Sequence, residues 1–600
     1  MRLRRAGRVH DPPGALPTVT RWHQRERARA ILQKEAGYII KPHGDRLRVA
    51  LAFPNTYFVG MSNLGFQTIY RLLNAEDDVV CERVFLPPKQ ELAELMTAKA
   101  PLVTLESQTP VGEFDVLAFS VSFEWDYVNV LTLLRLAGVP CYAAERDTRH
   151  PLVVVGGAVT FVNPEPLAPF ADVLAVGEGE ALIGPFVRRC RTETGRDAVL
   201  RGLAQERGFY VPAFYEATYG PTGPIEGFRP VDGHADVPLP VRKAAVRTTD
   251  ALDPPVTSIF TPETEFGSRF LIEVVRGCAN LCRFCWAGYN YLPVRAFPTE
   301  RILDLAEAAR RYAKRVGLVS IALCDHPDIE RILARLLEMG YGISPASLRL
   351  DDLTPTIVHL LRASGERSLT IAPETGSDRL RRVVNKTVTN DEILDRAELI
   401  FSSGLENLKL YFMIGLPTET DEDLVAIRDL TLALRERMVA HAKSRGQIGR
   451  IVGSVNPLIP KPGTAYQWLP MEDPATTERK IKRLRHLMAD IDNVYFNIKS
   501  ERHSYYQALL SLGDRRVAPA IEAAERNGQN WRAAVAEVGL DADAYIFRDR
   551  SQDRTLPWDI IDGGMKSSFF RSEFDKALKE EWTLPPKRQQ DNARLLPVIQ

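Results

Sequence analysis

The chain has 600 residues, of which 45% are hydrophobic and 26% are charged, a composition typical of soluble globular proteins. That length predicts three or four domains rather than one core. The 77 Lys and Arg residues balance the 77 Asp and Glu residues, which argues against a chain-wide electrostatic grip on nucleic acid. The chain contains no run of about 18 apolar residues, so the sequence predicts no membrane span.

Residues 1–44 are expected to form an N-terminal extension. Their basic start has no apolar stretch, so it is not a secretory signal, and it is interpreted as a surface-lying tail rather than a nucleic-acid arm. Seven cysteines in a chain of this length do not make a disulfide scaffold. An odd number with one tight group favours a reducing, cytoplasmic setting and a metal site.

Between residues 45 and 190, short apolar strands alternate with helical stretches. Strands are predicted at 48–54, 114–123, 151–157 and 171–180, and helices at 63–75 and 129–138. This alternation predicts a parallel, doubly wound Rossmann-like sheet. Ligands bind such sheets at the carboxyl ends of the strands. The residues at those ends are Ser120, Ser122, Gly156, Gly157, Gly177, Glu178 and Gly179.

A Pro- and Gly-rich region, residues 191–265, is predicted as a linker with a hairpin. The alternation then resumes over 266–470. Six strands are predicted there, at 269–275, 316–323, 344–350, 368–374, 407–417 and 451–460. Six strand–helix units predict a partial, open α/β barrel whose chemistry lies on loops at the carboxyl ends of the strands. Residues 471–600 are predicted to be mainly helical.

Three cysteines follow the first strand of the predicted barrel. Cys278, Cys282 and Cys285 have the spacing C-x3-C-x2-C, and the nearest other cysteine, Cys324, stands alone at a different strand end. Structural zinc usually takes four protein ligands. A [4Fe–4S] cluster accepts cysteine thiolates at similar spacing. With three thiolates, one iron stays open for a substrate or cofactor, so the sequence favours such a cluster over structural zinc.

With Phe284, this segment resembles the C-x3-C-x-aromatic-C signature of radical S-adenosylmethionine (SAM) enzymes. Three later segments resemble the same family: "PETGSDRLRRVVNK" (373–386), "KLYFMIGLPTETDED" (409–423) and "VNPLIPKPGT" (455–464). The resemblance implies that the open iron binds SAM through its amino and carboxylate groups. It also implies that one electron from the cluster cleaves SAM to methionine and a 5′-deoxyadenosyl radical, and that Phe284 packs beside the adenine.

The same resemblance implies which other residues bind SAM. Glu374, Thr375 and Ser377 are the candidates for the ribose and carboxylate. Gly415 and Pro417 would shape the adenine pocket.

The sequence departs from the family after the second barrel strand. Many relatives carry a Gly-Gly-Glu stretch there that holds the SAM amino group, whereas this chain has "LCDHPDI". Asp325 is the candidate substitute. The neighbouring Cys324 and His326 are interpreted as packing and turn-capping residues rather than catalytic ones.

Residues 153–180 resemble the cobalamin (B12)-binding domains that precede many radical SAM domains. The resemblance makes the seven strand-end residues of the first sheet candidate cobalamin contacts, with Ser120 and Ser122 near the lower part of the cofactor. The D-x-H-x-x-G motif is missing, so no histidine is marked as a lower cobalt ligand. A domain that has lost its cofactor stays as the alternative. The likeness to B12-binding-domain-containing radical SAM proteins runs from about residue 37 to 580.

The leading hypothesis is therefore a cobalamin-dependent radical SAM enzyme that transfers a methyl group to an unactivated carbon or phosphorus. One SAM would methylate the cobalt, and another would make the substrate radical. Tyr289, Tyr291 and Arg295 follow the cluster and are candidates to face the substrate, with packing at the barrel rim as the alternative. The expected partner is an electron donor such as flavodoxin or ferredoxin, and the substrate is unknown.

Two other hypotheses stay open. The first is a radical rearrangement, cyclisation or sulfur insertion on RNA or protein without cobalamin. The scattered Cys81, Cys141 and Cys190 read better as buried hydrophobes than as ligands of a second cluster. The second is a sensor that binds cobalamin or SAM and does not release 5′-deoxyadenosine.

Overall fold

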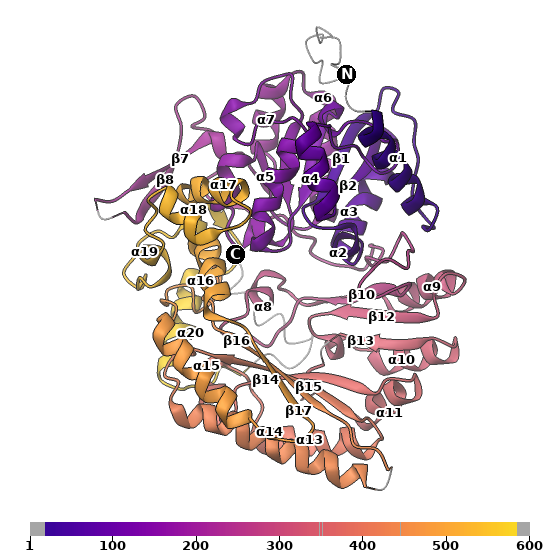
Figure 1. The fold of residues 1–600 in the computed structure, drawn as a ribbon, viewed down its shortest axis with the longest axis vertical. Coiled ribbons are helices and arrows are strands. Elements are labelled where there is room, and N and C mark those ends of the chain that lie inside the picture. Colours follow the sequence, from indigo (N-terminus) through magenta and orange to yellow (C-terminus); the bar gives the residue numbers. More distant parts are fainter. Residues whose placement is uncertain (1–17, 222, 347, 351, 444–445, 585–600) are drawn as a thin grey trace.

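The computed structural model describes residues 18–221, 223–346, 348–350, 352–443 and 446–584. Of the N-terminal extension expected at residues 1–44, residues 1–17 lie outside them, and the described part contains helix α1 (Thr18–Leu32). Two units built on parallel sheets are stacked on each other, and helices from the C-terminal part of the chain run along one side of both (Figure 1). Among the described residues, none of the helices combines the length and apolar character needed to cross a bilayer.

The N-terminal unit (residues 47–210) holds one six-stranded sheet with the order β2-β1-β3-β4-β5-β6. Its strands are β1 (Leu47–Phe53), β2 (Val79–Phe85), β3 (Val116–Ser120), β4 (Leu152–Gly156), β5 (Val173–Ala175) and β6 (Phe209–Tyr210). All neighbours are parallel except β5 and β6. The strand order reverses between β1 and β3, where doubly wound sheets bind their ligands. The doubly wound sheet predicted from the sequence is confirmed.

Its helices include α3 (Leu64–Ala75), α5 (Tyr127–Leu136) and α6 (Gly179–Thr192). The linker region adds α7 (Arg196–Ala204) and the predicted hairpin, β7 (Tyr215–Tyr219) with β8 (Ile225–Pro230). The side chain of Asn63 accepts a hydrogen bond from Phe66 N and begins α3. The Asn63 amide also donates to Ser122 Oγ at 3.1 Å, which holds the start of α3 beside the carboxyl end of β3.

The barrel unit (residues 270–498) is an open arc of two four-stranded sheets. The first has β10 (Phe270–Arg276), β11 (Arg295–Ala296), β12 (Arg315–Ser320) and β13 (Gly342–Pro345); the second has β14 (Ser368–Glu374), β15 (Asn407–Ile414), β16 (Ile451–Pro457) and β17 (Val494–Ile498). Except for the antiparallel β11, the strands are parallel. A hydrogen bond of 3.2 Å from Leu348 N to Thr370 O links the two sheets.

Six of these strands correspond to the six predicted strands, and the predicted partial barrel is confirmed. The sequence did not predict β17, because only one of its five residues is fully buried and the apolar signal is correspondingly weak. The barrel helices are α9 (Thr299–Ala309), α10 (Ile329–Glu338), α11 (Pro355–Ala363), α12 (Asp378–Val384), α13 (Asn390–Ser402), α14 (Asp421–Ala442) and α15 (Pro474–Met488).

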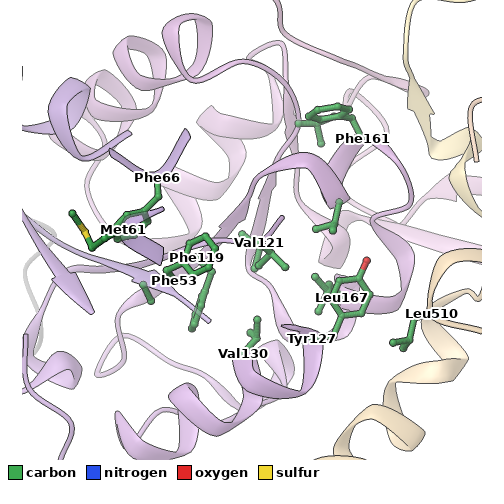
Figure 2. Packing of buried hydrophobic residues seen from close by; sticks show 14 of the residues in the cluster. Phe53, Met61, Phe66, Phe119, Val121, Tyr127, Val130, Phe161, Leu167 and Leu510 are labelled. Carbon is green, nitrogen blue, oxygen red and sulfur yellow. The ribbon is translucent and has the colours of Figure 1, made fainter. Parts of the chain in front are cut away.

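The C-terminal helices α16 (Glu501–Leu512), α17 (Ala518–Arg526), α18 (Trp531–Glu537) and α20 (Ser567–Leu578) join the two units. Arg135 of α5 donates to Glu522 and Glu525 of α17 at 2.8 and 2.9 Å. Leu510 of α16 belongs to the same hydrophobic core as Tyr127 of the N-terminal unit (Figure 2). The C-terminal part of the chain therefore fixes the two sheets relative to each other.

A buried group of charges also joins the two units. Glu178, in the loop after β5, accepts hydrogen bonds of 2.7 and 2.9 Å from Arg295 of the barrel unit. Arg276 of β10 lies 3.1 Å from Glu178 and also pairs with Glu180 and Glu273, at 2.9 and 2.7 Å. Burial alone would raise the pKa of Glu178, but the hydrogen bonds from Arg295 and the charge of Arg276 bring it below its ordinary value.

Replacement of Glu178 by Gln is expected to destabilise the protein by about 3 kcal/mol, because it leaves the buried Arg295 without its carboxylate partner. The same change at Glu216, whose pair with Arg229 is on the surface of the hairpin, is expected to cost less than about 1 kcal/mol. Thermal unfolding of both variants compares the two losses. Equal midpoints would show that the buried pair does not hold the units together.

Candidate active site

A cavity of about 610 Å³ lies where the carboxyl ends of the two sheets meet. All seven strand-end residues expected from the sequence line it: Ser120, Ser122, Gly156, Gly157, Gly177, Glu178 and Gly179. The barrel unit contributes Glu273, Val275, Arg276, Val319, Ser320 and Ile321, and the segment after the cysteines contributes Trp286, Ala287 and Tyr291. A molecule in this cavity would therefore touch both units.

The inner part of the cavity is an apolar slot between the N-terminal sheet and two helices. The sheet contributes Val49, Leu51, Ala118, Val154 and Ala175; α3 contributes Leu64, Gly65, Thr68, Ile69 and Leu73; α6 contributes Leu182, Ile183 and Phe186. Small side chains at 118 and 175 on the strands, and at 65 and 68 on the helix, leave this space open. The slot suits a flat apolar group whose polar remainder stays at the mouth.

Two of the glycines at the mouth serve the protein chain itself. A Cβ at Gly157, whose φ is +104°, would lie 2.3 Å from Val121 O. One at Gly177, whose φ is +138°, would lie 2.0 Å from Ala244 O. The sequence interpretation made these glycines candidate cobalamin contacts. The structure shows that each position requires glycine because another segment of the protein's own backbone passes too close for a Cβ atom.

The three cysteines lie on the loop between β10 and the short helix α8 (Trp286–Asn290). Burial raises the pKa of the Cys278, Cys282 and Cys285 thiols to about 12, 12 and 11, and each thiol also feels the charge of another of the three. The three thiols are therefore neighbours on this loop. Among the described residues, no three His, Cys, Asp or Glu side chains converge closely enough to hold a single metal ion.

Two cations lie beside the thiols. The charges of Lys386 and Arg349 both lower the pKa of Cys282, and that of Arg349 also lowers the pKa of Cys278. An iron–sulfur cluster is held by thiolates, so a three-thiol set with neighbouring cations fits such a group. Arg349 donates to Asp325 at 2.9 Å, which brings that candidate SAM ligand to the same loop.

The candidates after β14 divide into two kinds. Glu374 is buried at a φ of +66°, and Lys386 Nζ lies 3.2 Å from its Oε1. Burial raises the pKa of Glu374, and the charge of Lys386 opposes this shift. The Thr375 hydroxyl is buried and has no hydrogen-bond partner among the described residues, so it fits a bound polar ligand. Ser377 instead caps α12 and donates to Asp423 at 2.5 Å.

The candidates for the adenine pocket also lie together. Phe284 packs in one hydrophobic cluster with Met413 and Leu416, at the end of β15. Gly415 has a φ of +77°, and its N–H donates to the Glu419 carboxylate at 2.7 Å. Pro417 follows in the same turn. The aromatic residue of the cysteine motif and the end of β15 therefore share one hydrophobic cluster.

The candidates for substrate contact differ from one another. Tyr289 is 1% exposed, and its hydroxyl donates to Leu281 O at 2.9 Å. Arg295 is held by Glu178. These contacts favour the packing alternative for both residues. Tyr291 lines the cavity and makes an edge contact with Phe161 at 5.7 Å, so it is the one of the three that faces the open space.

His326 has a capping role. Asp328 N donates to its Nδ1 at 3.0 Å, so the proton lies on Nε2, which donates to Phe297 O at 2.8 Å. Burial lowers its pKa. Cys324 packs against the main hydrophobic core.

Sequence reasoning missed three charged residues beside the cysteines: Lys386, Arg349 and Arg283. Lys386 is the last residue of the motif quoted for 373–386, so it could have been named as a candidate from that motif. Arg283 stands between two of the cysteines, so it could also have been named as a candidate from the cysteine motif. Arg349 follows the third barrel strand, and its approach to the cysteines depends on strands that pair far apart in the sequence.

Comparison with known proteins agrees with this geometry. Residues 65–212 match the family model described as radical SAM proteins, N-terminal, and residues 272–431 match that of the radical SAM superfamily. An uncharacterized protein of Methanocaldococcus jannaschii is 27% identical over 476 residues, which cover 79% of this chain and 90% of that protein. The tRNA-2-methylthio-N(6)-dimethylallyladenosine synthase of Thermotoga petrophila is 23% identical over 43% of this chain and 55% of its own length.

Two solved structures are similar at lower levels. The cobalamin-dependent SAM radical enzyme OxsB with aqua-cobalamin bound has a TM-score of 0.43 and 16% identity, over 64% of this chain and about half (52%) of that one. The radical SAM methyltransferase TsrM from Kitasatospora setae has a TM-score of 0.42 and 12% identity, over 68% and 72%. These values do not establish a shared cofactor or reaction. One family match lies in each unit, and the chain is a radical SAM enzyme, a member of the superfamily whose cofactors are a [4Fe–4S] cluster and SAM.

Proposed function

We propose that this radical SAM enzyme binds cobalamin in its N-terminal unit and transfers a methyl group to an unactivated substrate atom. The observation that carries the proposal is the single cavity of about 610 Å³. It reaches from the slot in the N-terminal sheet to Trp286 and Ala287, which directly follow the last cysteine. Two cofactors that act on one substrate atom must lie this close together.

The residues of the chain have the following proposed roles. Cys278, Cys282 and Cys285 hold the cluster, and Asp325, Glu374 and Thr375 hold SAM, with Phe284, Gly415 and Pro417 beside the adenine. When bound and reduced, the cluster supplies the electron that cleaves SAM. The protein orients the two groups and excludes water from them. Ser377 acts through α12, which it caps.

The apolar slot supports cobalamin as the ligand of the N-terminal unit. Its apolar lining between the sheet and the helices suits the flat, apolar base at the end of a nucleotide tail, and Ser120, Ser122 and Asn63 provide polar groups at its mouth. No histidine is among the described residues that line the cavity. Cobalamin would then bind without a histidine on the lower face of the cobalt, in line with the missing D-x-H-x-x-G motif.

The rival reactions receive less support. Burial raises the pKa of Cys81, Cys141 and Cys190, and the three are spread over β2, the segment after α5 and α6. They do not form a second cluster site of the kind expected for sulfur insertion.

A sensor would bind both cofactors and leave SAM intact. The electron donor is proposed to be a small redox protein such as flavodoxin or ferredoxin.

Replacement of Cys282 by Ala is expected to reduce the iron bound after anaerobic reconstitution and to abolish release of 5′-deoxyadenosine from SAM, because the cluster loses one of three ligands. Cys190→Ala makes the same chemical change in the core of the N-terminal unit and should leave both quantities at the wild-type level. Iron analysis and chromatography of the products measure them. Full SAM cleavage by the Cys282 variant would contradict the site, and a wild-type protein that binds SAM without cleaving it would favour the sensor.

Replacement of Ala118 by Phe is expected to weaken binding of hydroxocobalamin by at least about tenfold, because the larger side chain fills the slot between sheet and helices. Thr68→Ala changes the same slot in the opposite direction and should retain binding. Absorption spectroscopy of the cobalamin bands measures the bound fraction in both variants. If Ala118→Phe binds as tightly as the wild type, the ligand does not enter the slot.

A further inference from the structure

The side chain of Arg283 reaches into the C-terminal part of the protein. Arg283 stands between Cys282 and Cys285 and is fully buried. Its Nε donates to Glu573 Oε2 of α20 at 3.1 Å, and both side chains have an exposure of 0%. A buried pair of this kind is costly to break because one charge is left without a partner.

The remaining donors of this guanidinium reach the ends of two helices. Three carbonyls accept from it: those of Arg382 and Val383, at 2.7 and 3.1 Å, near the end of α12, and that of Glu581, at 2.8 Å, just after α20. The C-terminal end of a helix carries partial negative charge and unpaired carbonyls, so a cation is favourable there. Arg283 thus joins the cysteine loop to α12 and α20 at once.

A second contact runs through Asn385, which ends α12 at a φ of +56°. Its amide donates to Leu281 O at 3.2 Å, and its side-chain oxygen accepts from Thr583 N at 2.9 Å. Thr583 in turn donates to Glu573 Oε1 at 2.6 Å. One amide therefore spans the gap between the cysteine loop and the residues that follow α20.

The third contact is aromatic. Leu281 lies between the cysteines at a φ of +53°, a conformation that persists only where neighbours impose it. Tyr289 donates to Leu281 O at 2.9 Å, and its ring lies 5.1 Å from that of Phe570 of α20. The strained residue of the loop is thus held by Asn385 and Tyr289, and both of these contact the C-terminal part of the chain.

We propose that residues 567–584, the C-terminal clamp, hold the cysteine loop in the shape that the iron–sulfur cluster requires, with Glu573 as a positioning residue. The inference rests on the proposed role of Cys278, Cys282 and Cys285 as cluster ligands and is independent of the cobalamin proposal. Because clamp and cluster order the same loop, each stabilises the other, and the coupling is reciprocal. Loss of the cluster loosens residues 567–584, and loss of the clamp contact releases iron.

The first experiment compares Glu573→Gln with Asp575→Asn in the full-length protein. Both exchange a carboxylate for an amide on α20, but Asp575 is exposed. After reconstitution, iron loss to a ferrous chelator is followed at a temperature at which circular dichroism shows each variant folded. Glu573→Gln is expected to lose iron at least about tenfold faster than the wild type, as for a buried pair that has lost one partner. It should also show an altered electron paramagnetic resonance spectrum of the reduced cluster, whereas Asp575→Asn should match the wild type in both.

The second experiment needs no variant, so it decides the question even if Glu573→Gln does not fold. Hydrogen exchange of the wild type is measured with and without the cluster. Exchange in residues 567–584 is expected to slow by at least about tenfold when the cluster is present, since exchange reports local opening. The hairpin at 215–230 should be unaffected.

Three results overturn the proposal. Equal rates of iron loss from Glu573→Gln and Asp575→Asn, with a wild type that holds its cluster, would refute the clamp proposal and leave the proposed function unaffected. Exchange at 567–584 that does not depend on the cluster has the same meaning. A wild type that takes up no iron removes both proposals together.

Discussion

The shape of the cysteine loop is the constraint on which the rest of this structure depends. Three thiols must face one space, although the loop between β10 and α8 has no regular structure of its own. The loop is held instead by hydrogen bonds that the Arg283 side chain donates to α12 and α20, which come roughly 100 and 290 residues later in the chain. A loop that carries reactive groups is usually positioned by a rigid scaffold, and here the scaffold includes the far end of the protein.

The second organising feature is that the carboxyl ends of two unrelated sheets face each other. Each sheet alone would offer a shallow crevice at its strand ends. Stacked, they enclose one cavity whose walls are apolar in the N-terminal sheet and charged where Glu178 meets Arg276 and Arg295. The charged wall is satisfied within the protein, so its main effect is to set the distance between the two units. That distance decides which molecules can span both.

Local patterning predicted the two parallel-sheet units, their strand ends and the cysteine motif, because burial and spacing along a segment decide these features. It did not predict β17, which is only partly buried and pairs with β16. The site was predictable only in part. Arg295 and Glu178 were each singled out as ligand contacts, but they bind each other, and no local pattern records a partner 117 residues away. The same applies to Gly157 and Gly177, which accommodate the chain's own backbone.

The distance along the chain between Arg283 and Glu573 bears on how the protein is made. Synthesis proceeds from the N-terminus, and 290 residues separate the two members of this ion pair. At about 5–20 residues per second, the cysteines leave the ribosome at least about 15 seconds before their last supporting helix exists. During that interval the cysteine loop lacks its contacts with the C-terminal clamp. Assembly of the metal centre therefore belongs after synthesis of residues 567–584, and a product truncated before them would carry all three cysteines without the contacts that hold their loop.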